Sequence, residues 1–401
     1  MGDDSPTTPL SQEAFPVTER WIYLNNAGRA PLSRGAADAL AEFGRESSRS
    51  GCLAFNDQMA RVERTRELAA QLMGTSADEV AFIKNTTEGL AFVANGFPWE
   101  AGDRILIPSC EFPSTRLAFS GLASRGVDID LVEPEGPGAT LPIERFAAQL
   151  AAAPHPTMVV VSWVQFAQGW RTDLRDLASA CHEVGAILCV NAIQGLGVLT
   201  AEFGEIGVDI AVADGHKWML GPEGAGVLSI TAEHLDRLVP TELGWNSVVP
   251  RGDWSGNGSL DPTARRFEGG SLNLAGIAGL GASLELLLGA GIDRIEHHVD
   301  RLCDQLVAGL TASGRAVISD RGRGRSPIVT FDPLHARPED LCAGLRSHGV
   351  VTAPRATGVR LSPHAYVSAD DIAAALEAID RCDRPDPVLG GTRPALAEGL
   401  R

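Results

Sequence analysis

The chain has 401 residues, a length that allows two or three domains, and its 44% hydrophobic and 21% charged residues are ordinary for a globular chain of this size. Its net charge of −17 argues against nucleic acid and anionic membrane surfaces as partners, because both need basic patches. Seven scattered cysteines without a C-x-x-C pair indicate a reducing compartment. With no apolar N-terminal segment and no membrane-length apolar run, we expect a cytoplasmic protein.

The N-terminal part predicts an arm, a strand and two helices. Residues 1–18 are polar and contain proline, so we expect a loosely held arm. An apolar stretch at 21–24 predicts a short strand. Apolar residues recur at helical spacing over 33–45 and 58–73, and the residues between them, 47–56, are expected to form a flexible loop.

From residue 80 the sequence alternates between apolar runs and helical stretches. Strands separated by helices indicate βαβ units and a mostly parallel sheet that helices cover on both faces. The expected strands are 80–83, 104–107, 127–132, 158–162, 186–190, 209–213 and 225–230, with helices that start at Thr87, Ser114, Pro142 and Asp173. These seven strands predict a large α/β domain.

The pattern changes after a Gly-, Ser-, Asp- and Arg-rich stretch at 250–266. A smaller α+β domain is expected there, with helices from Gly276 and Ile292, strands near 316 and 327, and helices near 338 and 369. The predicted divisions are an arm at 1–18, a large domain at 19–275, a small C-terminal domain at 276–383 and a flexible tail at 384–401.

Lys217 is the first candidate functional residue. The chain has 34 lysines and arginines, and only Lys84 and Lys217 are lysines. Lys217 follows an apolar strand and precedes Leu-Gly-Pro, which places it on a turn at the edge of a buried sheet. A desolvated amine loses its proton easily and can form a Schiff base with an aldehyde. The structural alternative is a surface lysine.

Polar and aromatic residues follow several of the predicted strands, where ligands bind in such sheets. Thr86 and Thr87 open a helix, and a helix N-terminus favours a phosphate, although helix capping alone also explains this pair. Gln194 and His216 follow neighbouring strands, and Phe112 offers a flat ring for stacking. Together they predict a site for a phosphorylated aromatic aldehyde.

Six motifs follow one another along the chain: NTTEG at 85–89, EFPS at 111–114, VSWVQ at 161–165, NAIQG at 191–195, GHKWMLGP at 215–222 and FEGGSLN at 267–273. This set resembles the class V aminotransferase family of fold-type I pyridoxal phosphate enzymes, which includes cysteine desulfurases, cysteine C–S lyases and isopenicillin N epimerases. The resemblance covers residues 23–379. It implies the fold-type I architecture and a homodimer with active sites at the subunit interface.

The resemblance also implies roles for the matched residues. Lys217 holds pyridoxal 5'-phosphate covalently and later moves the substrate Cα proton. Thr86, Thr87 and His216 contact the cofactor phosphate, and Ser271 of the second subunit makes a further phosphate contact. Phe112 stacks on the cofactor ring, at a position where many relatives have His. Gln194 hydrogen-bonds the phenolic oxygen of the ring. Asp214 orients the phosphate-site donors or serves only as a turn residue.

Three further residues are candidates for substrate binding. Arg360 matches the arginine that holds a substrate α-carboxylate, which a planar guanidinium grips at two points, and a surface salt bridge is its alternative role. Asn26 belongs to a turn of small and amide residues that lines a cavity. Trp245 lines the substrate channel or is a buried interface residue.

The sequence departs from the family pattern at two places. Asn191 stands where the family has an aspartate that keeps the pyridine nitrogen protonated. A neutral amide makes the ring a weaker electron sink, which favours β-elimination over transamination or, as the alternative, marks lost activity. The catalytic cysteine of desulfurases is also missing from residues 346–360, and Cys342 is expected in the core. The pair His297 and His298 has no further ligands, so we expect no metal.

We therefore predict a pyridoxal phosphate-dependent lyase that breaks a C–S bond at Cβ of a cysteine-derived substrate, in secondary metabolism or elsewhere. The alternatives are a class V aminotransferase, an epimerase similar to isopenicillin N epimerase, a decarboxylating variant, and a catalytically silent binding protein that keeps the fold.

Overall fold

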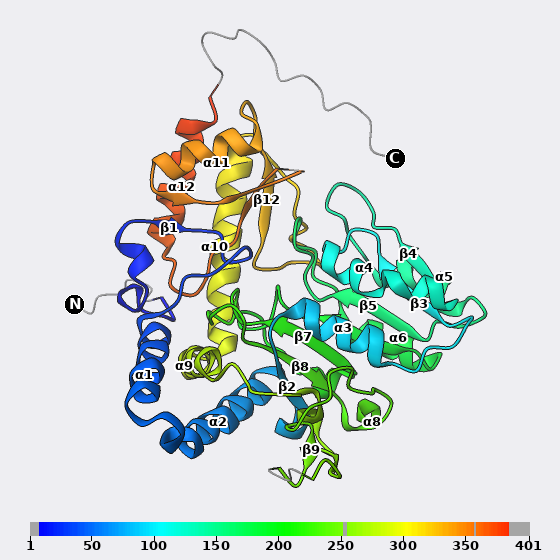
Figure 1. Cartoon of the computed structure of the whole chain (residues 1–401). Helices are drawn as coiled ribbons and strands as arrows, with labels where there is room; N and C mark the ends of the chain where they lie inside the picture. Colours follow the sequence, from blue (N-terminus) through cyan, green and yellow to red (C-terminus); the bar gives the residue numbers. More distant parts are fainter. Residues whose placement is uncertain (1–7, 252–254, 357, 385–401) are drawn as a thin grey trace.

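A seven-stranded sheet forms the centre of the computed structural model, which describes residues 8–251, 255–356 and 358–384 (Figure 1). The strands lie in the order β2 (Val80–Ile83), β8 (Gly226–Ile230), β7 (Ile210–Asp214), β6 (Ile187–Asn191), β5 (Met158–Ser162), β3 (Arg104–Pro108) and β4 (Asp128–Val132). Strand β8 runs antiparallel to the other six strands of this sheet. The predicted mostly parallel sheet of seven strands is confirmed.

The strands read as continuous apolar runs because both faces of the sheet are covered. Successive residues of β6 enter two different hydrophobic cores: Leu188 and Val190 pack on one face, Ile187 and Cys189 on the other. The helices of the βαβ units that contribute to these cores include α3 (Thr86–Gly96) and α4 (Pro113–Ser120) on the second face, and α5 (Ile143–Ala151) and α6 (Leu174–Glu183) on the first. The βαβ pattern of the sequence therefore predicts correctly that helices cover both faces of the sheet.

The segment between the first two long helices is helical. Helix α1 (Arg34–Ser50) is followed by a 3₁₀ turn, η3 (Gly51–Ala54), and then by α2 (Phe55–Met73). Gly51 ends α1 with a positive φ of 50°, and its N–H donates to the Ser47 carbonyl. The prediction of a flexible loop at 47–56 is wrong, because the glycine redirects a helical chain instead of starting an irregular segment.

The described part of the N-terminal arm is held firmly. Two 3₁₀ turns lie in this segment, η1 (Gln12–Ala14) and η2 (Pro16–Glu19), and η2 extends one residue beyond the predicted arm. Leu10 and Phe15 are buried, and the Phe15 ring stacks on Tyr366 at 4.3 Å between centroids. The expectation of a loosely held arm is therefore wrong for residues 8–18, because two large apolar side chains anchor it.

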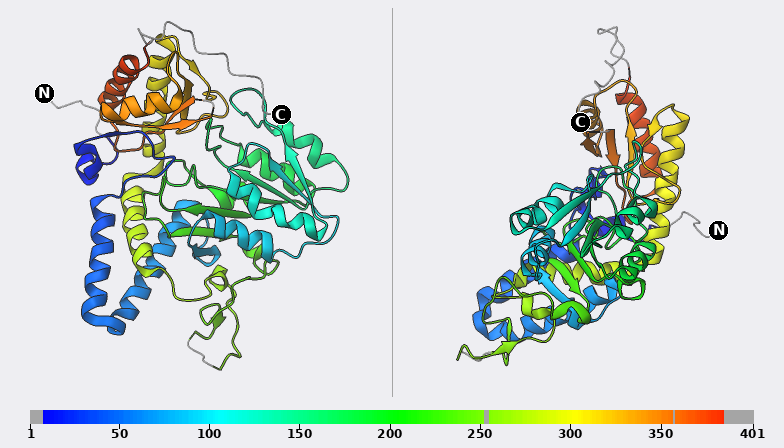
Figure 2. Two further views of the ribbon diagram at one scale, coloured as in Figure 1. Left: turned by 45° about the horizontal axis from the view of Figure 1, so that its top comes forward. Right: turned by 90° about the vertical axis from the view of Figure 1, so that its right-hand side faces the viewer.

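A four-stranded antiparallel sheet organises the C-terminal part, which Figure 2 shows gathered at one end of the molecule. Its strands lie in the order β11 (Ala316–Val317), β12 (Val329–Asp332), β15 (Gly358–Leu361) and β14 (Ala353–Arg355). The helices are α11 (Pro338–Ser347) and α12 (Ala369–Cys382), and a separate parallel pair joins β1 (Ile22–Tyr23) to β13 (Val350–Val351). The α+β character agrees with the sequence, which did not predict β13, β14 or β15.

Two long helices lead from the first part to the second. Helix α9 (Leu274–Ala290) packs against α1 and α2, and α10 (Ile292–Ala312) packs against α12. The two helices are bent by 80° relative to each other, and together they pass a length and composition test for a membrane span that no single described helix passes. The predicted domain boundary at 275/276 stays a prediction, as does the tail at 384–401, which lies outside the described residues except for Arg384.

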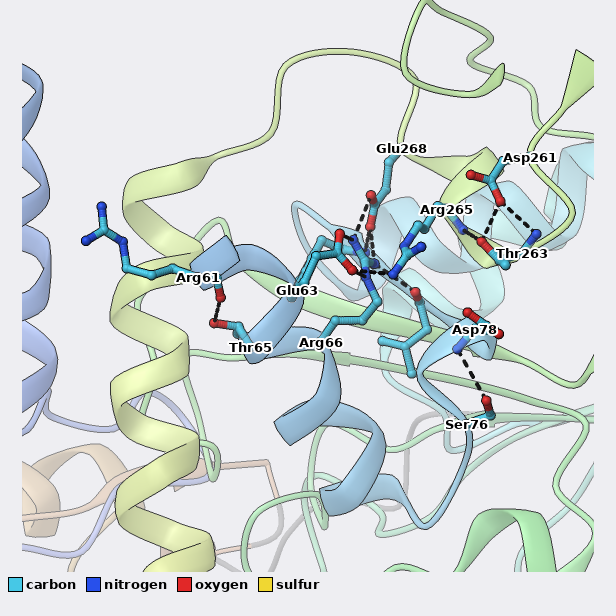
Figure 3. Close-up of polar contacts among 12 residues, drawn as sticks. Arg61, Glu63, Thr65, Arg66, Ser76, Asp78, Asp261, Thr263, Arg265 and Glu268 are labelled. Carbon is cyan, nitrogen blue, oxygen red and sulfur yellow. Dashed lines mark hydrogen bonds and ion pairs between the residues drawn. The ribbon is translucent and has the colours of Figure 1, made fainter. Parts of the chain in front are cut away.

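A buried ion pair ties α2 to the segment before α9 (Figure 3). Arg66 Nη1 lies 2.6 Å from Glu268 Oε1, and neither side chain is exposed to solvent. Arg66 also donates to the Val80 carbonyl, and Glu268 accepts from the Phe82 N–H, so the pair is anchored to the backbone of β2. Although burial disfavours its charge, the Glu268 carboxylate raises the pKa of Arg66.

Candidate active site

Lys217 lies just beyond the carboxyl end of β7, in surroundings that favour a neutral amine. Burial, helped by the positive charges of Arg360 and Arg355 and opposed by the charge of Asp214, lowers the pKa of Lys217 to about 7. Its Nζ lies 5.8 Å from the centroid of the Phe112 ring. Lys84 differs, because its exposed side chain forms an ion pair with Glu88 at 2.6 Å. Lys217 therefore has the desolvated amine that Schiff base chemistry needs, and the surface-lysine alternative describes Lys84.

The N-terminus of α3 offers unused donors. Asn85 caps this helix, since its side chain accepts from the Glu88 N–H, and the helix begins at Thr86, one residue earlier than predicted. Thr86 is buried, and its Oγ1 has no hydrogen-bond partner within the described residues, whereas Thr87 is exposed. The first N–H groups of a helix also lack acceptors inside the helix. Because Asn85 does the capping, both threonines are left for a phosphate.

Asp214 and His216 form a pair beside this helix. The Oδ2 atom of Asp214 lies 3.0 Å from Nδ1 of His216. Helix α3 packs on β7, where Gly89 fits against Val212 so closely that a Cβ atom would lie 2.8 Å from Val212 Cγ1. Asp214 thus lies within ion-pair distance of His216, but Nδ1 of His216 makes no hydrogen bond to a described residue. The role of Asp214 in orienting the phosphate-site donors stays a prediction.

Phe112 and Gln194 flank Lys217 with the expected chemistry. The Phe112 ring is 42% exposed and packs edge-on against Phe166 at 5.2 Å, so one ring face is open for stacking. Gln194 is buried, donates to the Ala27 carbonyl at 3.0 Å and accepts from the Trp218 indole at 2.9 Å. An amide NH₂ has two donors, so one N–H of Gln194 remains for a ligand oxygen.

Asn191 belongs to a buried hydrogen-bond chain that the sequence did not reveal. Its Nδ2 donates to Thr115 Oγ1 at 3.2 Å, and the Thr115 side chain in turn hydrogen-bonds Glu111. Glu111 accepts from both the N–H and the hydroxyl of Ser162 at 2.5 Å. Burial raises the pKa of Glu111, against the lowering effect of these hydrogen bonds. A carboxyl directly after an apolar strand was the signal in the sequence that could have identified it.

Arg360 is a fully buried guanidinium without a counterion. Its Nη1 donates to the Phe166 carbonyl at 2.6 Å and its Nη2 to Asn25 Oδ1 at 3.2 Å, while its Nε is buried without a partner. No carboxylate of the described residues lies within ion-pair distance of it. Burial and the nearby charge of Arg355 lower the pKa of Arg360 well below its usual range. Such a group binds an incoming carboxylate strongly.

The structure does not bring Asn26 to the site. Its amide is buried and engaged at both ends, since it donates to the Ser362 carbonyl at 2.9 Å and accepts from the Tyr366 hydroxyl at 2.7 Å. The preceding residue, Asn25, makes the contact with Arg360 instead. The sequence placed an amide here correctly but could not distinguish which of two adjacent residues faces the site.

Trp245 and Ser271 also lie apart from Lys217 within one chain. Both line an apolar cavity of about 620 Å³ with Phe55 and Met59 of α2, and Lys217 is not among the residues that line it. Ser271 is exposed, and Trp245 is 43% exposed. A role of these two residues at a cofactor or substrate site requires a second copy of the chain.

Neither Cys342 nor Cys110 offers a reactive thiol in place of the missing desulfurase cysteine. Cys342 is buried in α11, where it accepts a hydrogen bond from Thr352 at 3.2 Å, and burial raises its pKa. Burial and the Glu111 charge raise the pKa of Cys110 to about 12. Across the described residues, no group of three or more His, Cys, Asp or Glu could hold a metal ion.

These groups fit pyridoxal phosphate. The free Thr86 hydroxyl and the α3 N-terminus suit its phosphate, the open Phe112 face suits its ring, and the amine of Lys217 suits its aldehyde. Asp214 Oδ1 is buried without a partner in the described part of the chain, so the site also holds an unused acceptor.

Comparisons with known proteins agree with this chemistry. The Aminotransferase class-V family profile matches residues 22–366. A probable cysteine desulfurase of Methanothermobacter thermautotrophicus is 28% identical over 380 residues, which cover 89% of this chain and 94% of the relative. An apo cysteine desulfurase from Thermococcus onnurineus has the same fold, with a TM-score of 0.85, 24% identity and coverage of 93% and 97% of the two chains. So has the cystine C-S lyase C-DES in complex with its reaction product cysteine persulfide, with a TM-score of 0.83, 21% identity and coverage of 92% and 100%. The chain thus belongs to the class V aminotransferase family and is a pyridoxal phosphate-dependent enzyme of fold type I.

Proposed function

We propose that this enzyme cleaves the Cβ–S bond of a cysteine-derived amino acid by β-elimination. The observation that carries the proposal is the pairing of a lysine whose pKa is lowered to about 7 with a buried arginine that lacks a counterion. Arg360 would bind the substrate α-carboxylate, and Lys217 would take the proton from Cα. Bound pyridoxal phosphate supplies the electron withdrawal that makes this proton acidic.

The net reaction converts an S-substituted cysteine and water into a thiol, pyruvate and ammonia. Lys217 removes the Cα proton, the electron pair left at Cα forms a bond to Cβ, and the sulfur departs with the electrons of the Cβ–S bond and gains a proton. Arg360 holds the α-carboxylate while this happens, and Phe112 closes one side of the site. Arg360 thus positions the substrate and Lys217 transfers the proton.

Asn191 favours elimination over transamination. A neutral amide favours the protonated form of the cofactor ring nitrogen less than an aspartate would, so the ring stabilises a carbanion less. Elimination depends less on this stabilisation, because the leaving group departs as soon as the carbanion forms. Persulfide transfer to the protein has no support, because residues 346–360 contain no cysteine. The relatives named as cysteine desulfurases and the cystine C-S lyase support a substrate derived from cysteine.

A homodimer completes the proposal. Leu53 is 87% exposed and Phe55 45% exposed, next to the apolar cavity that Trp245 and Ser271 line. A second copy that covers this face would bury these side chains and bring Ser271 to the phosphate site of its partner. The seven free cysteines agree with a reducing compartment, and we propose the cytoplasm.

The test is a product analysis of the pyridoxal phosphate-loaded protein with a panel of S-substituted cysteines. We expect pyruvate, ammonia and thiol in equal amounts. A keto acid formed together with the pyridoxamine form of the cofactor would identify an aminotransferase, racemised substrate an epimerase, and carbon dioxide a decarboxylating variant. A protein that binds every substrate of the panel without any product would be catalytically silent.

A further inference from the structure

A second arginine lies on the same side of the C-terminal sheet as Arg360. In the antiparallel pair of β14 and β15, Ala353 lies opposite Arg360 and Arg355 lies opposite Gly358. Opposed residues and residues two apart on one strand share a sheet face, so the side chains of Arg355 and Arg360 project from the same face. They are diagonal neighbours, whose Cα atoms are about 7–8 Å apart in such sheets.

Arg355 is partly buried, and it also lacks a counterion. Its Nη1 donates only to the carbonyl of the adjacent Pro354, at 2.7 Å, and its Nε is buried without a partner. No ion pair joins Arg355 to an acidic residue in the described part of the chain. Other arginines with little exposure behave differently, since Arg266 pairs with Asp236 and Arg315 with Asp383.

Three cationic groups therefore lie close enough for their charges to act on one another. The charge of Arg355 lowers the pKa of both Lys217 and Arg360, which places it close enough to act on each of them, and burial lowers the pKa of Arg355 itself. Asp214 is the acidic residue that raises the pKa of Lys217. A single substrate α-carboxylate would neutralise Arg360 and leave Arg355 without an anion.

We propose that Arg355 forms a second anion subsite, and that the natural substrate is an S-substituted cysteine whose substituent ends in a carboxylate or sulfonate. This inference rests on the proposed function. Arg360 then binds the α-carboxylate and Arg355 the distal anion, each through a guanidinium that the fold leaves unpaired. The atoms balance as in the general reaction, because S-carboxymethylcysteine and water yield mercaptoacetate, pyruvate and ammonia.

A pair of substrates that differ only in charge tests the subsite. S-carboxymethylcysteine and its amide, S-carbamoylmethylcysteine, have nearly the same shape. We expect the wild-type enzyme to prefer the anionic substrate by about 10- to 100-fold in kcat/KM. Arg355→Gln should abolish this preference, because it should lower kcat/KM for the anionic substrate far more than for the amide, which makes no charged contact there.

Two more variants control for general damage. Arg355→Lys keeps the charge and should retain part of the preference, although it lacks the two-pronged grip. Arg346→Gln removes an exposed arginine from the neighbouring helix α11 and should retain all of it. An equal loss for both substrates in Arg355→Gln would overturn the proposal, because it would mean that Arg355 grips the shared α-carboxylate or supports the fold.

Calorimetric titration of both compounds separates this proposal from the reaction on which it rests. Tighter binding of the anionic compound without pyruvate formation would support the subsite and refute β-elimination. Pyruvate formation from both compounds at equal kcat/KM would support β-elimination and refute the subsite.

Discussion

Two buried arginines of this protein show opposite solutions to the same physical problem. Arg66 and Arg360 are both fully buried. Arg66 has Glu268 at 2.6 Å, within the network drawn in Figure 3, and its pKa is raised. Arg360 has only a carbonyl and an amide oxygen as partners, and its pKa is lowered. A buried charge that a protein leaves uncompensated costs stability, so its retention points to a ligand.

The same contrast separates two regions of the molecule. Around α2, charges are matched by other charges of the chain, as in the contacts of Glu63 with Arg66 and Arg265. Around Lys217, the charges of Arg355 and Arg360 lower the pKa of the lysine, and Asp214 is the acid that opposes them. The first region holds the fold together, and the second is arranged to bind anions. Each prediction below tests one side of this contrast.

The largest effect is expected at the lysine of the unpaired region. Lys217→Ala removes both the amine that binds the cofactor and the group that moves the Cα proton, so activity should fall by about 10³-fold or more. Borohydride reduction followed by mass spectrometry should find no cofactor attached to the chain. Lys84→Ala, which removes the other lysine and only an exposed ion pair, should retain attachment and activity. A reducible link in Lys217→Ala would show that the wrong lysine was chosen.

The two arginines should differ in their effect on stability. Arg66→Met leaves Glu268 buried without a partner and should lower the free energy of unfolding by about 3–5 kcal/mol. Arg360→Met removes an unpaired charge along with two hydrogen bonds to neutral acceptors, so we expect a loss of no more than about 1 kcal/mol. Urea unfolding of the cofactor-free proteins measures both values. An equal loss of unfolding free energy in the two variants would contradict the distinction between the two regions.

The lowered pKa of Lys217 predicts a pH dependence for cofactor attachment. The neutral amine is the attacking form, so attachment to the cofactor-free protein should accelerate about tenfold per pH unit below pH 7 and level off above it. Stopped-flow absorbance follows this reaction. Arg360→Met removes a positive charge that lowers the pKa, so the midpoint should move to higher pH. A midpoint near 10, the range of an ordinary lysine, would contradict the desolvated site.

The smallest effect concerns the neutral amide. Asn191→Asp should strengthen the electron sink and raise the share of pyridoxamine formed per turnover, by no more than about tenfold, because one pKa unit corresponds to a tenfold change. Chromatography of the cofactor forms after a fixed number of turnovers measures the share. An unchanged product ratio would remove Asn191 as the reason for elimination.

Much of this architecture could be predicted from the sequence. The apolar runs that became β5, β6 and β7 are long and flanked by helical patterns, so their type and order were readable. The short strands β13, β14 and β15 were missed, because two to four residues carry too little periodicity. Residues 47–56 are helical instead of a flexible loop, because Gly51 ends one helix directly before a 3₁₀ turn begins.

The site could be predicted only in part, because some of its residues are brought together by strand pairing and by contacts between distant segments. Motifs identified Lys217 and Arg360, because their neighbours in the chain mark them. The position of Arg355 beside Arg360 depends on the pairing of β14 with β15, and the chain from Asn191 through Thr115 to Glu111 joins residues of β6, α4 and the loop before it. Such contacts arise from the fold, and no local pattern specifies them.

The most direct test of the account compares the kinetics of wild type and Arg360→Met with an S-substituted cysteine and with the corresponding α-carboxamide. The account predicts that Arg360→Met lowers kcat/KM for the amino acid by about 100-fold and leaves the poor turnover of the carboxamide nearly unchanged, because only the carboxylate uses the unpaired guanidinium. An equal loss for both compounds would contradict the claim that Arg360 is left unpaired for the substrate carboxylate.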